Sequence, residues 1–287
     1  MGIWPKFGNI YSLPSITKLL LKWQNYKLQL HCSKNVICYF LSLLSITGNF
    51  ELQLQLSVQL TKQYPYVVPK ITFKQKGMAH VSSLALQNIR DLIEIVKWNE
   101  QNGFKVYRMS SDMFPWMSEY ELKDLPDFQK ISTLLKGVGN LALKYGQRLS
   151  FHPGPFNVLG SPNPTLVQKT IKELNQHAEI MDIMGLPQSH FYPINIHCNG
   201  VYGDKMATMG RWASNYLNLS KSAQARLVVE NDDKGSMYSV KDLYEGIFSA
   251  VKVPITFDFH HHRFQTGGLS EQEAFELAMS TWHHHNV

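Results

Sequence analysis

The chain has 287 residues, of which 44% are hydrophobic and 17% are charged. This composition supports a substantial hydrophobic core and excludes an intrinsically disordered chain. The net charge of +6 favours a polyanionic partner such as nucleic acid, without requiring one. The 3 cysteines lack the pair spacing of a zinc site and are too few for a disulfide framework, so an intracellular location in the cytoplasm or nucleus is expected.

The first part of the chain, residues 1–68, has no regular hydrophobic period and is left unassigned. Its one clear pattern is the alternation in ELQLQLSVQL at 51–60, which predicts a strand with one buried face. The longest apolar run, VICYFLSLLSI at 36–46, is shorter than the roughly 20 residues that a helix needs to cross a bilayer. It also begins too far from Met1 to be a secretory signal, so no membrane contact is expected.

From about residue 82 the chain alternates amphipathic stretches with short apolar strands. Helices are expected at 82–104, within 119–145, and at 164–185, 206–220, 240–250 and 270–282. Strands are expected at 106–109, 148–151, 193–197, 226–230 and 254–258. Repeated strand–helix units predict a parallel sheet covered by helices, which is either a (β/α)₈ barrel or an open doubly wound sheet. No GxGxxG motif follows a strand, which counts against a dinucleotide-binding open sheet.

Polar residues end four of these predicted strands: His152, His197, Glu230 and Asp258. Barrel enzymes build their sites from the loops at the C-terminal ends of several strands, so this placement favours the α/β (β/α)₈ TIM barrel. By contrast, His177 and His190 fall on a helix and in a loop, and both are predicted to lie at the surface.

The residue types at the strand ends are those that bind divalent metal ions. Imidazole and carboxylate groups are common ligands of zinc and manganese, and a two-metal site supports phosphodiester hydrolysis. Glu230 follows a run of valines, where an unpaired carboxylate would be unfavourable, so a functional role is favoured. For His152 and His197 the alternative is an ordinary hydrogen bond to the backbone, and for the histidines after Asp258 it is a solvated loop.

A resemblance to the UV-damage endonuclease family is carried by five segments in order: YRMSSDMFPW, RLSFHPGPFNVLGSPNP, IHCNGVYGDK, RLVVENDD and FDFHHH. It covers about residues 69–287 and implies that they form a (β/α)₈ barrel domain. It also implies an endonuclease of DNA repair that nicks double-stranded DNA 5′ to cyclobutane dimers and 6-4 photoproducts by metal-activated water. Two or three divalent ions, commonly manganese, and a monomeric enzyme are expected with it.

The resemblance also implies roles for single residues. The metal ligands that it implies are His152, His197, Glu230, Asp258 and His261. Catalysis is assigned to three of these residues, Glu230, Asp258 and His197. Because only His261 stands at the family's Asp-x-x-His spacing, His260 and His262 are expected to support the site or face solvent.

The DNA contacts that the resemblance implies are Pro155, Phe156, Asn157, Tyr202 and Lys205. The family carries a Gln-Tyr pair where this chain has Pro155 and Phe156. Phe156 can stack on a base as an aromatic wedge, or else pack on the barrel rim, whereas Pro155 cannot supply the hydrogen bonds of an amide. Glu119 stands where many members carry a histidine, and it either lies near the metals or caps the following helix.

Two parts of the family pattern are absent. The glycine-tyrosine motif of the first strand is not recognisable in QYPYVVPK, and the sequence ends at STWHHHNV, where the family continues into two further strands. A barrel without its last two strands is therefore expected. Three functions remain open: a metal-dependent endonuclease, a catalytically inactive relative that retains DNA affinity, and a sugar-isomerase-like metal barrel.

Overall fold

The computed structural model describes residues 70–283, which belong to the second of two compact units, Phe40–Val287. The strand predicted at 51–60 and the apolar run at 36–46 lie outside the described residues. None of the described helices combines the length and the apolar character needed to cross a bilayer.

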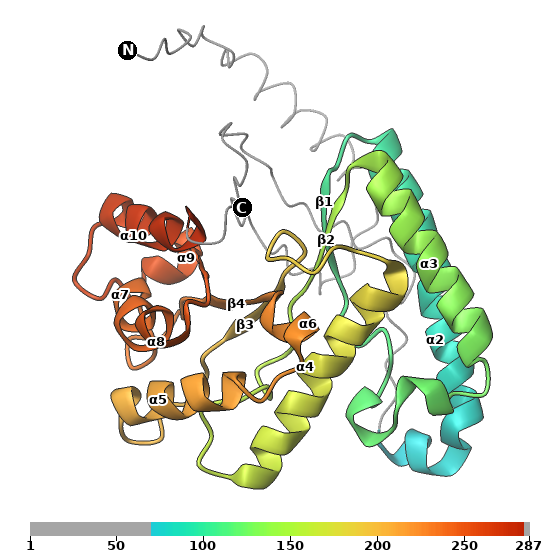
Figure 1. Cartoon of the computed structure of the whole chain (residues 1–287), viewed down its shortest axis with the longest axis horizontal. Coiled ribbons are helices and arrows are strands. Elements are labelled where there is room, and N and C mark those ends of the chain that lie inside the picture. Colours follow the sequence, from blue (N-terminus) through green and yellow to red (C-terminus); the bar gives the residue numbers. More distant parts are fainter. Residues whose placement is uncertain (1–69, 284–287) are drawn as a thin grey trace, which may run out of the picture. The chain divides into compact units, whose positions relative to one another are not determined.

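The described residues alternate strands with helices in chain order (Figure 1). The strands are β1 (Val106–Met109), β2 (Arg148–Phe151), β3 (Ile194–His197), β4 (Leu227–Glu230) and β5 (Ile255–Thr256). The helices are α2 (Lys70–Gln101), α3 (Phe128–Tyr145), α4 (Pro164–Met184), α5 (Lys205–Tyr216), α6 (Lys221–Gln224), α7 (Val240–Leu243), α8 (Ser249–Val251), α9 (Phe259–His262) and α10 (Glu271–His283). Short turns of 3₁₀-helix, η1 (Met117–Glu119) and η2 (Leu122–Asp124), precede α3, and one π-helical turn, η3 (Tyr244–Phe248), joins α7 to α8. All five strands predicted from the sequence are confirmed.

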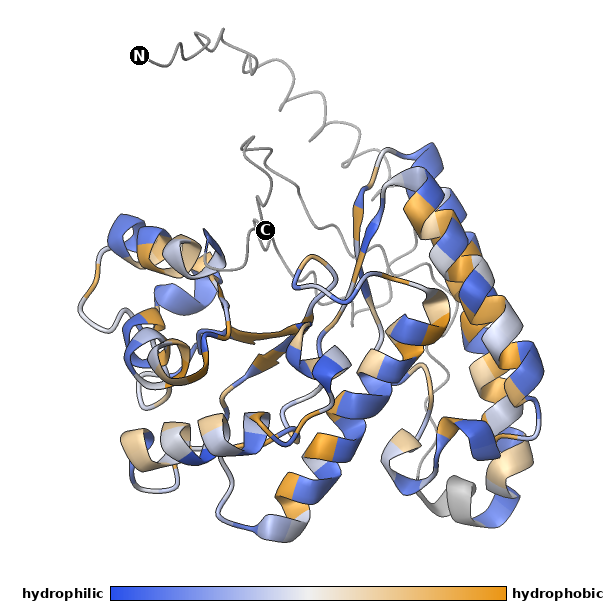
Figure 2. Ribbon diagram, viewed as in Figure 1, coloured by the Kyte–Doolittle hydropathy of each residue, from blue (hydrophilic) through white to orange (hydrophobic). Residues whose placement is uncertain are grey.

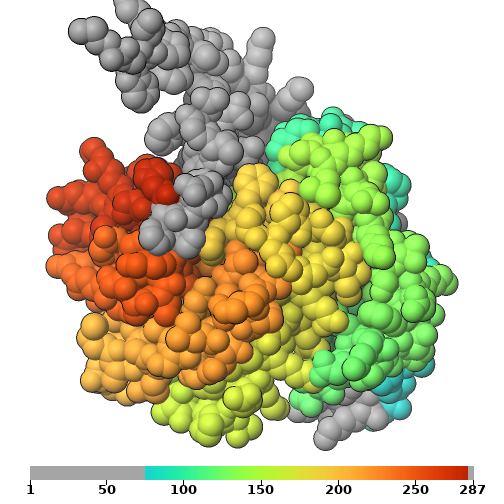
Figure 3. Space-filling view, viewed as in Figure 1, coloured from blue at the N-terminus to red at the C-terminus, as the bar shows by residue number. Residues whose placement is uncertain are grey.

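The five strands form one parallel sheet in the order β1-β2-β3-β4-β5. A doubly wound sheet reverses its strand order at a switch point, whereas the strands of a (β/α)₈ barrel follow the chain. The sheet is therefore α/β with the order of a barrel, as predicted. Figure 3 shows the successive segments, from green through yellow to red, lying side by side in chain order.

The two faces of the sheet differ in chemistry. Partners in the register of neighbouring parallel strands share a face. One face carries rows of large apolar residues, such as Met109, Phe151 and Ile194, and it packs against helices, since the Phe151 ring contacts α4. The opposite face carries polar residues, and His197 is paired there with Glu230. The hydrophobic and hydrophilic positions that alternate along α3 and α4 match this arrangement, with one side of each helix buried (Figure 2).

The helix ends follow their local sequence signals. Asn163 caps α4 by accepting hydrogen bonds from two backbone N–H groups, and Gly185 ends that helix at φ 76°, a left-handed conformation that glycine adopts readily. Ser270 and Glu273 form a capping box at the start of α10, because the Ser270 N–H donates to Glu273 Oε2 at 2.8 Å and the Glu273 N–H donates to Ser270 Oγ at 3.3 Å.

The prediction that His177 and His190 lie at the surface is wrong, because their side chains are 0% and 8% exposed. His177 lies on the face of α4 that meets the sheet, where its ring and the Phe151 ring pack in a T-shaped arrangement with centroids 4.7 Å apart. Its Nδ1–H donates to the Glu173 carbonyl at 2.8 Å, which satisfies one polar atom without solvent. His190 lies beside Trp282, with ring centroids 6.4 Å apart.

The burial of His177 predicts a dependence of stability on pH. Burial lowers its pKa to about 4, against 6.5 for an ordinary histidine. As the pH falls below about 6.5, the unfolded chain binds a proton at this histidine and the folded chain does not, so the contribution of His177 to the free energy of unfolding should fall by about 2 kcal/mol by pH 5. Urea unfolding at pH 7.5 and pH 5 measures the loss in the unmodified protein and in His177→Gln, and the difference between the two proteins separates this histidine from the other titrating groups. The loss should be smaller in His177→Gln, and an equal pH dependence of both proteins would contradict the assignment.

Candidate metal centre

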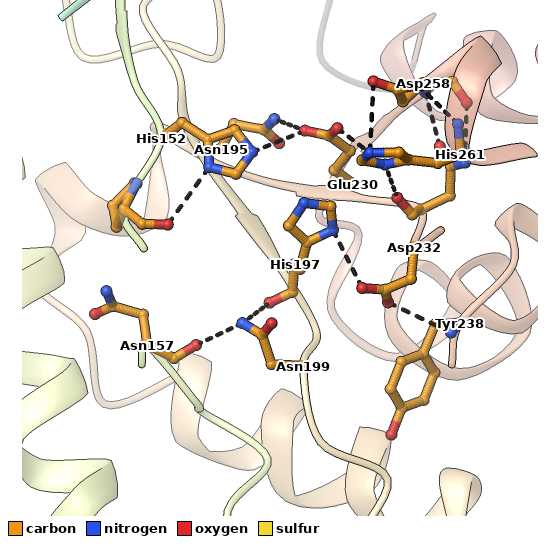
Figure 4. Close-up of polar contacts among 12 residues, drawn as sticks. His152, Asn157, Asn195, His197, Asn199, Glu230, Asp232, Tyr238, Asp258 and His261 are labelled. Atoms are coloured by element: carbon orange, nitrogen blue, oxygen red, sulfur yellow. Dashed lines mark hydrogen bonds and ion pairs between the residues drawn. The ribbon is translucent and has the colours of Figure 1, made fainter. Parts of the chain in front are cut away.

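Three neighbouring strands bring the first predicted ligands together. His152 follows the last residue of β2, His197 ends β3 and Glu230 ends β4. His197 and Glu230 are register partners, so their side chains project from the same face of the sheet. Figure 4 shows these three residues and the pair Asp258 and His261 turned toward one another.

A first group of candidate ligands consists of His152, His197 and Glu230, whose donor atoms all lie within 4.8 Å of one another. His152 Nε2 is 3.1 Å from Glu230 Oε2. The His152 and His197 rings lie 5.2 Å apart between centroids. Two imidazole nitrogens and a carboxylate oxygen are a common donor set for a divalent metal.

A second group consists of Glu230, Asp258 and His261, again with donor atoms within 4.8 Å of one another. His261 Nδ1 lies 3.5 Å from Glu230 Oε1, and His261 Nε2 lies 4.0 Å from Asp258 Oδ2. Asp258 is the N-cap of α9, and its Oδ1 accepts the backbone N–H groups of His260 and His261 at 2.7 and 2.9 Å. The cap turns His261 toward Glu230 and leaves Oδ2 outside the capping bonds.

Glu230 is shared by both groups, with Oε2 facing His152 and Oε1 facing His261. Its side chain is almost completely buried, and Asn195 donates a hydrogen bond to Oε2. Burial alone would raise the pKa of Glu230, but the hydrogen bond from His152 and the charges of the three histidines bring it down to about 2. Glu230 is therefore an ionised carboxylate with its two oxygens directed at two separate sets of ligands.

The centre favours positive charge. Burial would lower the pKa of His197, but the hydrogen bond to Asp232 and the charges of Glu230, Asp232 and Asp233 raise it to about 9. The same negative potential favours a cation among these side chains. The donor set, the shared carboxylate and this potential together fit divalent metal ions at both groups.

Three supporting residues were missed by the sequence reasoning: Asn195, Asn231 and Asp232. Asp232 Oδ1 lies 3.3 Å from His197 Nδ1, a carboxylate–histidine pair that orients metal-binding imidazoles. Asn231 is fully buried, and its side chain joins the end of β4 to Asp258 through two hydrogen bonds of 2.8 and 3.1 Å. The available signal was the polar run NDD directly after a buried strand.

The remaining histidines of the triplet are outside both groups. His260 is exposed and His262 is buried against the Phe257 ring, at 5.4 Å between centroids. Glu119 is in neither group and does not cap α3, whose N-cap is Asp127. It ends η1 and pairs with Lys169 on α4 at 3.6 Å.

The residues expected to contact DNA have very different environments. Phe156 is 89% exposed, so the alternative that its ring packs on the barrel rim is wrong. Pro155 beside it is also exposed, and Tyr202 is 45% exposed in a left-handed conformation with φ 50°. Asn157, in contrast, is 2% exposed, and Lys205 forms an ion pair of 3.0 Å with Asp242.

Comparisons with known proteins give a consistent result. The family model described as UV-endonuclease UvdE matches residues 52–287. The UV-damage endonuclease of Neurospora crassa is 36% identical over an alignment of 221 residues, which covers 72% of this chain and 32% of that protein. The UV-damage endonuclease of Schizosaccharomyces pombe is 37% identical over 202 residues, which are 70% of this chain and 33% of that protein.

A solved structure described as "Crystal Structure of SacUVDE" is also similar, with a TM-score of 0.65 and 30% sequence identity. The similarity covers 75% of this chain and 71% of that chain. The chain spans about a third of the length of the Neurospora and Schizosaccharomyces relatives. The match to the family model covers most of the chain, and the chain therefore belongs to the UV-endonuclease UvdE family.

Proposed function

We propose that this chain is a metal-dependent DNA repair endonuclease that nicks double-stranded DNA 5′ to UV photoproducts. The observation that carries the proposal is the pair of ligand groups that share Glu230 at the strand ends of a UvdE-family chain. We further propose that residues 69–287 form its barrel domain. The monomeric state and the intracellular location stay predictions from the sequence.

The side chains of the strand ends would hold the metal, and we propose Mn²⁺ because mixed nitrogen and oxygen donors suit it. The proposed ligands are His152, His197, Glu230, Asp258 and His261. Divalent ions at such a centre supply the positive charge that activates water and stabilises the leaving oxygen of a phosphodiester. Within the protein, His261 Nδ1–H donates to the Asn231 carbonyl at 2.9 Å, which leaves Nε2 with the lone pair that a ligand needs.

Of the proposed catalytic residues, Glu230 provides a buried charge that is fully ionised at neutral pH, since its pKa is lowered to about 2. Asp258 combines two tasks, because one oxygen caps α9 and the other faces His261. His197 is oriented by Asp232. These contacts hold the ligands in place before substrate arrives, which limits the reorganisation that binding requires.

DNA would be contacted by exposed groups of the strand-end loops. Phe156 and Tyr202 offer aromatic surface for stacking on bases, and Pro155 lies next to Phe156. Lys205, at the start of α5, donates to Asp242 on α7 and to the carbonyl of Met237, so we assign it to shaping this surface beside Tyr202. The net charge of +6 suits a polyanionic partner.

Replacing Phe156 tests the proposed DNA contact. Phe156→Ala should weaken binding to a duplex with one cyclobutane dimer by about 5- to 30-fold, because base stacking on an aromatic side chain contributes about 1–2 kcal/mol. Fluorescence anisotropy in EDTA measures the dissociation constant without cleavage. Leu217→Ala is the matched control, since Leu217 is 63% exposed but lies at the C-terminal end of α5. Equal affinities of Phe156→Ala and the unmodified protein would contradict the contact.

The function itself is tested by incubating the full chain and Mn²⁺ with a duplex that contains one photoproduct, and mapping the products on a denaturing gel. The proposal predicts a single nick on the 5′ side of the lesion and none in EDTA. Binding without a nick would instead support the inactive relative. The absence of both binding and a nick would contradict the proposal and leave the sugar-isomerase-like barrel, which ketose and aldose substrates then test.

A further inference from the structure

The loop that carries Phe156 is held by hydrogen bonds on both sides of that residue, whose aromatic ring is exposed. It runs from β2 to α4, and Phe156 is 89% exposed while the next residue, Asn157, is 2% exposed. The Asn157 N–H donates to the Gly154 carbonyl at 3.1 Å, which closes a tight turn around Pro155 and Phe156. The Val158 N–H donates to Thr170 Oγ1 on α4 at 3.0 Å.

The Asn157 side chain adds two further hydrogen bonds that hold the turn. Its Nδ2 donates to the Gly154 carbonyl at 3.2 Å and to Glu173 Oε1 on α4 at 3.0 Å. Burial raises the pKa of Glu173, and the hydrogen bond from Asn157 opposes that rise. The amide thus joins the turn to a helix whose position is fixed by the core, and its donor atom faces the protein interior.

A second amide joins the same turn to the metal centre. Asn199, two residues after the candidate ligand His197, donates through Nδ2 to the carbonyls of both Asn157 and His197 at 3.2 Å (Figure 4). Asn199 itself adopts a left-handed conformation at φ 54°. The turn is therefore connected to α4 on one side and to the end of β3 on the other.

We infer that Asn157 is a positioning residue, which fixes the Phe156 turn between Glu173 and Asn199 at a set place beside the metal centre and does not itself contact DNA. The inference rests on the proposed function in that the target of Phe156 is a DNA base. Because the turn is already held in one conformation, DNA binding does not lose the conformational entropy of ordering a mobile loop. It also keeps a stacked base at a constant distance from the strand-end ligands, as a nick at one fixed bond requires.

The positioning role is tested first without DNA, by hydrogen exchange at the backbone N–H groups of Asn157 and Val158. Glu173→Ala removes the acceptor of the Asn157 amide, so both N–H groups should exchange at least about 10-fold faster. Glu173→Gln keeps an acceptor oxygen and should stay within about 3-fold of the unmodified protein. Glu179→Ala removes a carboxylate from another face of α4 and should leave the exchange unchanged. Unchanged exchange in Glu173→Ala would overturn the inference.

A double-mutant cycle then links the turn to DNA. For a photoproduct duplex in EDTA, Glu173→Ala should weaken binding about 5-fold when Phe156 is present and less than about 2-fold in the Phe156→Ala background. An equal weakening in both backgrounds would overturn the inference, because Glu173 would then act independently of the ring. If Phe156→Ala has no effect while exchange still rises in Glu173→Ala, the DNA role of Phe156 fails and the positioning of the turn by Asn157 is upheld.

Discussion

Glu230→Gln is expected to lower the rate of incision at a photoproduct by at least about 100-fold. Residues that only orient metal ligands change affinity or activity by about 10- to 100-fold when they are replaced, and Glu230 is a proposed ligand of two groups at once. Glutamine has the same shape but no charge, so it weakens both groups without leaving a cavity. The measurement is the single-turnover rate on a duplex with one photoproduct at saturating Mn²⁺.

Two comparisons make this result specific. Glu276→Gln removes an exposed carboxylate on α10 and should leave the rate unchanged. The melting temperature of Glu230→Gln, measured without metal, should show that the variant is folded, because Asn195 and His152 still face a polar group at that position. An incision rate equal to that of the unmodified protein would contradict the role of Glu230 as a ligand shared by the two groups.

Gly139→Ala is expected to destabilise the fold strongly. Gly139 lies where α3 crosses the end of α4, and a Cβ atom there would lie 1.8 Å from the carbonyl oxygen of Met184. The obstructing atom is backbone, so the two helices must move apart. The expected loss is about 3 kcal/mol or more in the free energy of unfolding, the upper end of the range for overpacked cores.

Gly137, two residues earlier in α3, provides the matched control. Nothing lies within 4 Å of the position that a Cβ atom would take there, so Gly137→Ala should stabilise the helix by about 0.5–1 kcal/mol. Urea unfolding of both variants gives the two free energies. A loss in Gly139→Ala no larger than the change in Gly137→Ala would mean that α3 and α4 do not approach as closely as the structure has them.

The strands were predictable from the sequence because each is a short apolar run between clear helix signals. RLVVE and PINIH combine β-branched residues with a polar residue at the end, and β4 and β3 lie within these segments. The same pattern identified His197 and Glu230 as neighbours at the strand ends. Chain order then placed them on adjacent strands, without any information on side-chain direction.

The features of the fold and of the candidate site that could not be predicted from the sequence are those that depend on the direction of a side chain. His177 was predicted to be exposed because a histidine on an amphipathic helix is usually solvated, but its position on α4 faces Phe151. The histidine triplet after Asp258 forms a helical turn because Asp258 caps it, and this determines that His261 faces Glu230. Asn157 was expected from the sequence to contact DNA, but its side chain turns inward to Glu173 and the residue is buried.

Equilibrium Mn²⁺ binding to the full chain tests most directly whether the strand ends form a metal centre. In a titration followed by the electron paramagnetic resonance signal of free Mn²⁺, the two groups that share Glu230 predict at least two ions bound per chain. Glu230→Gln should retain fewer ions, each more weakly, while Glu276→Gln should match the unmodified protein. Coincident isotherms for the unmodified protein and Glu230→Gln, or no Mn²⁺ bound by either, would contradict the metal centre.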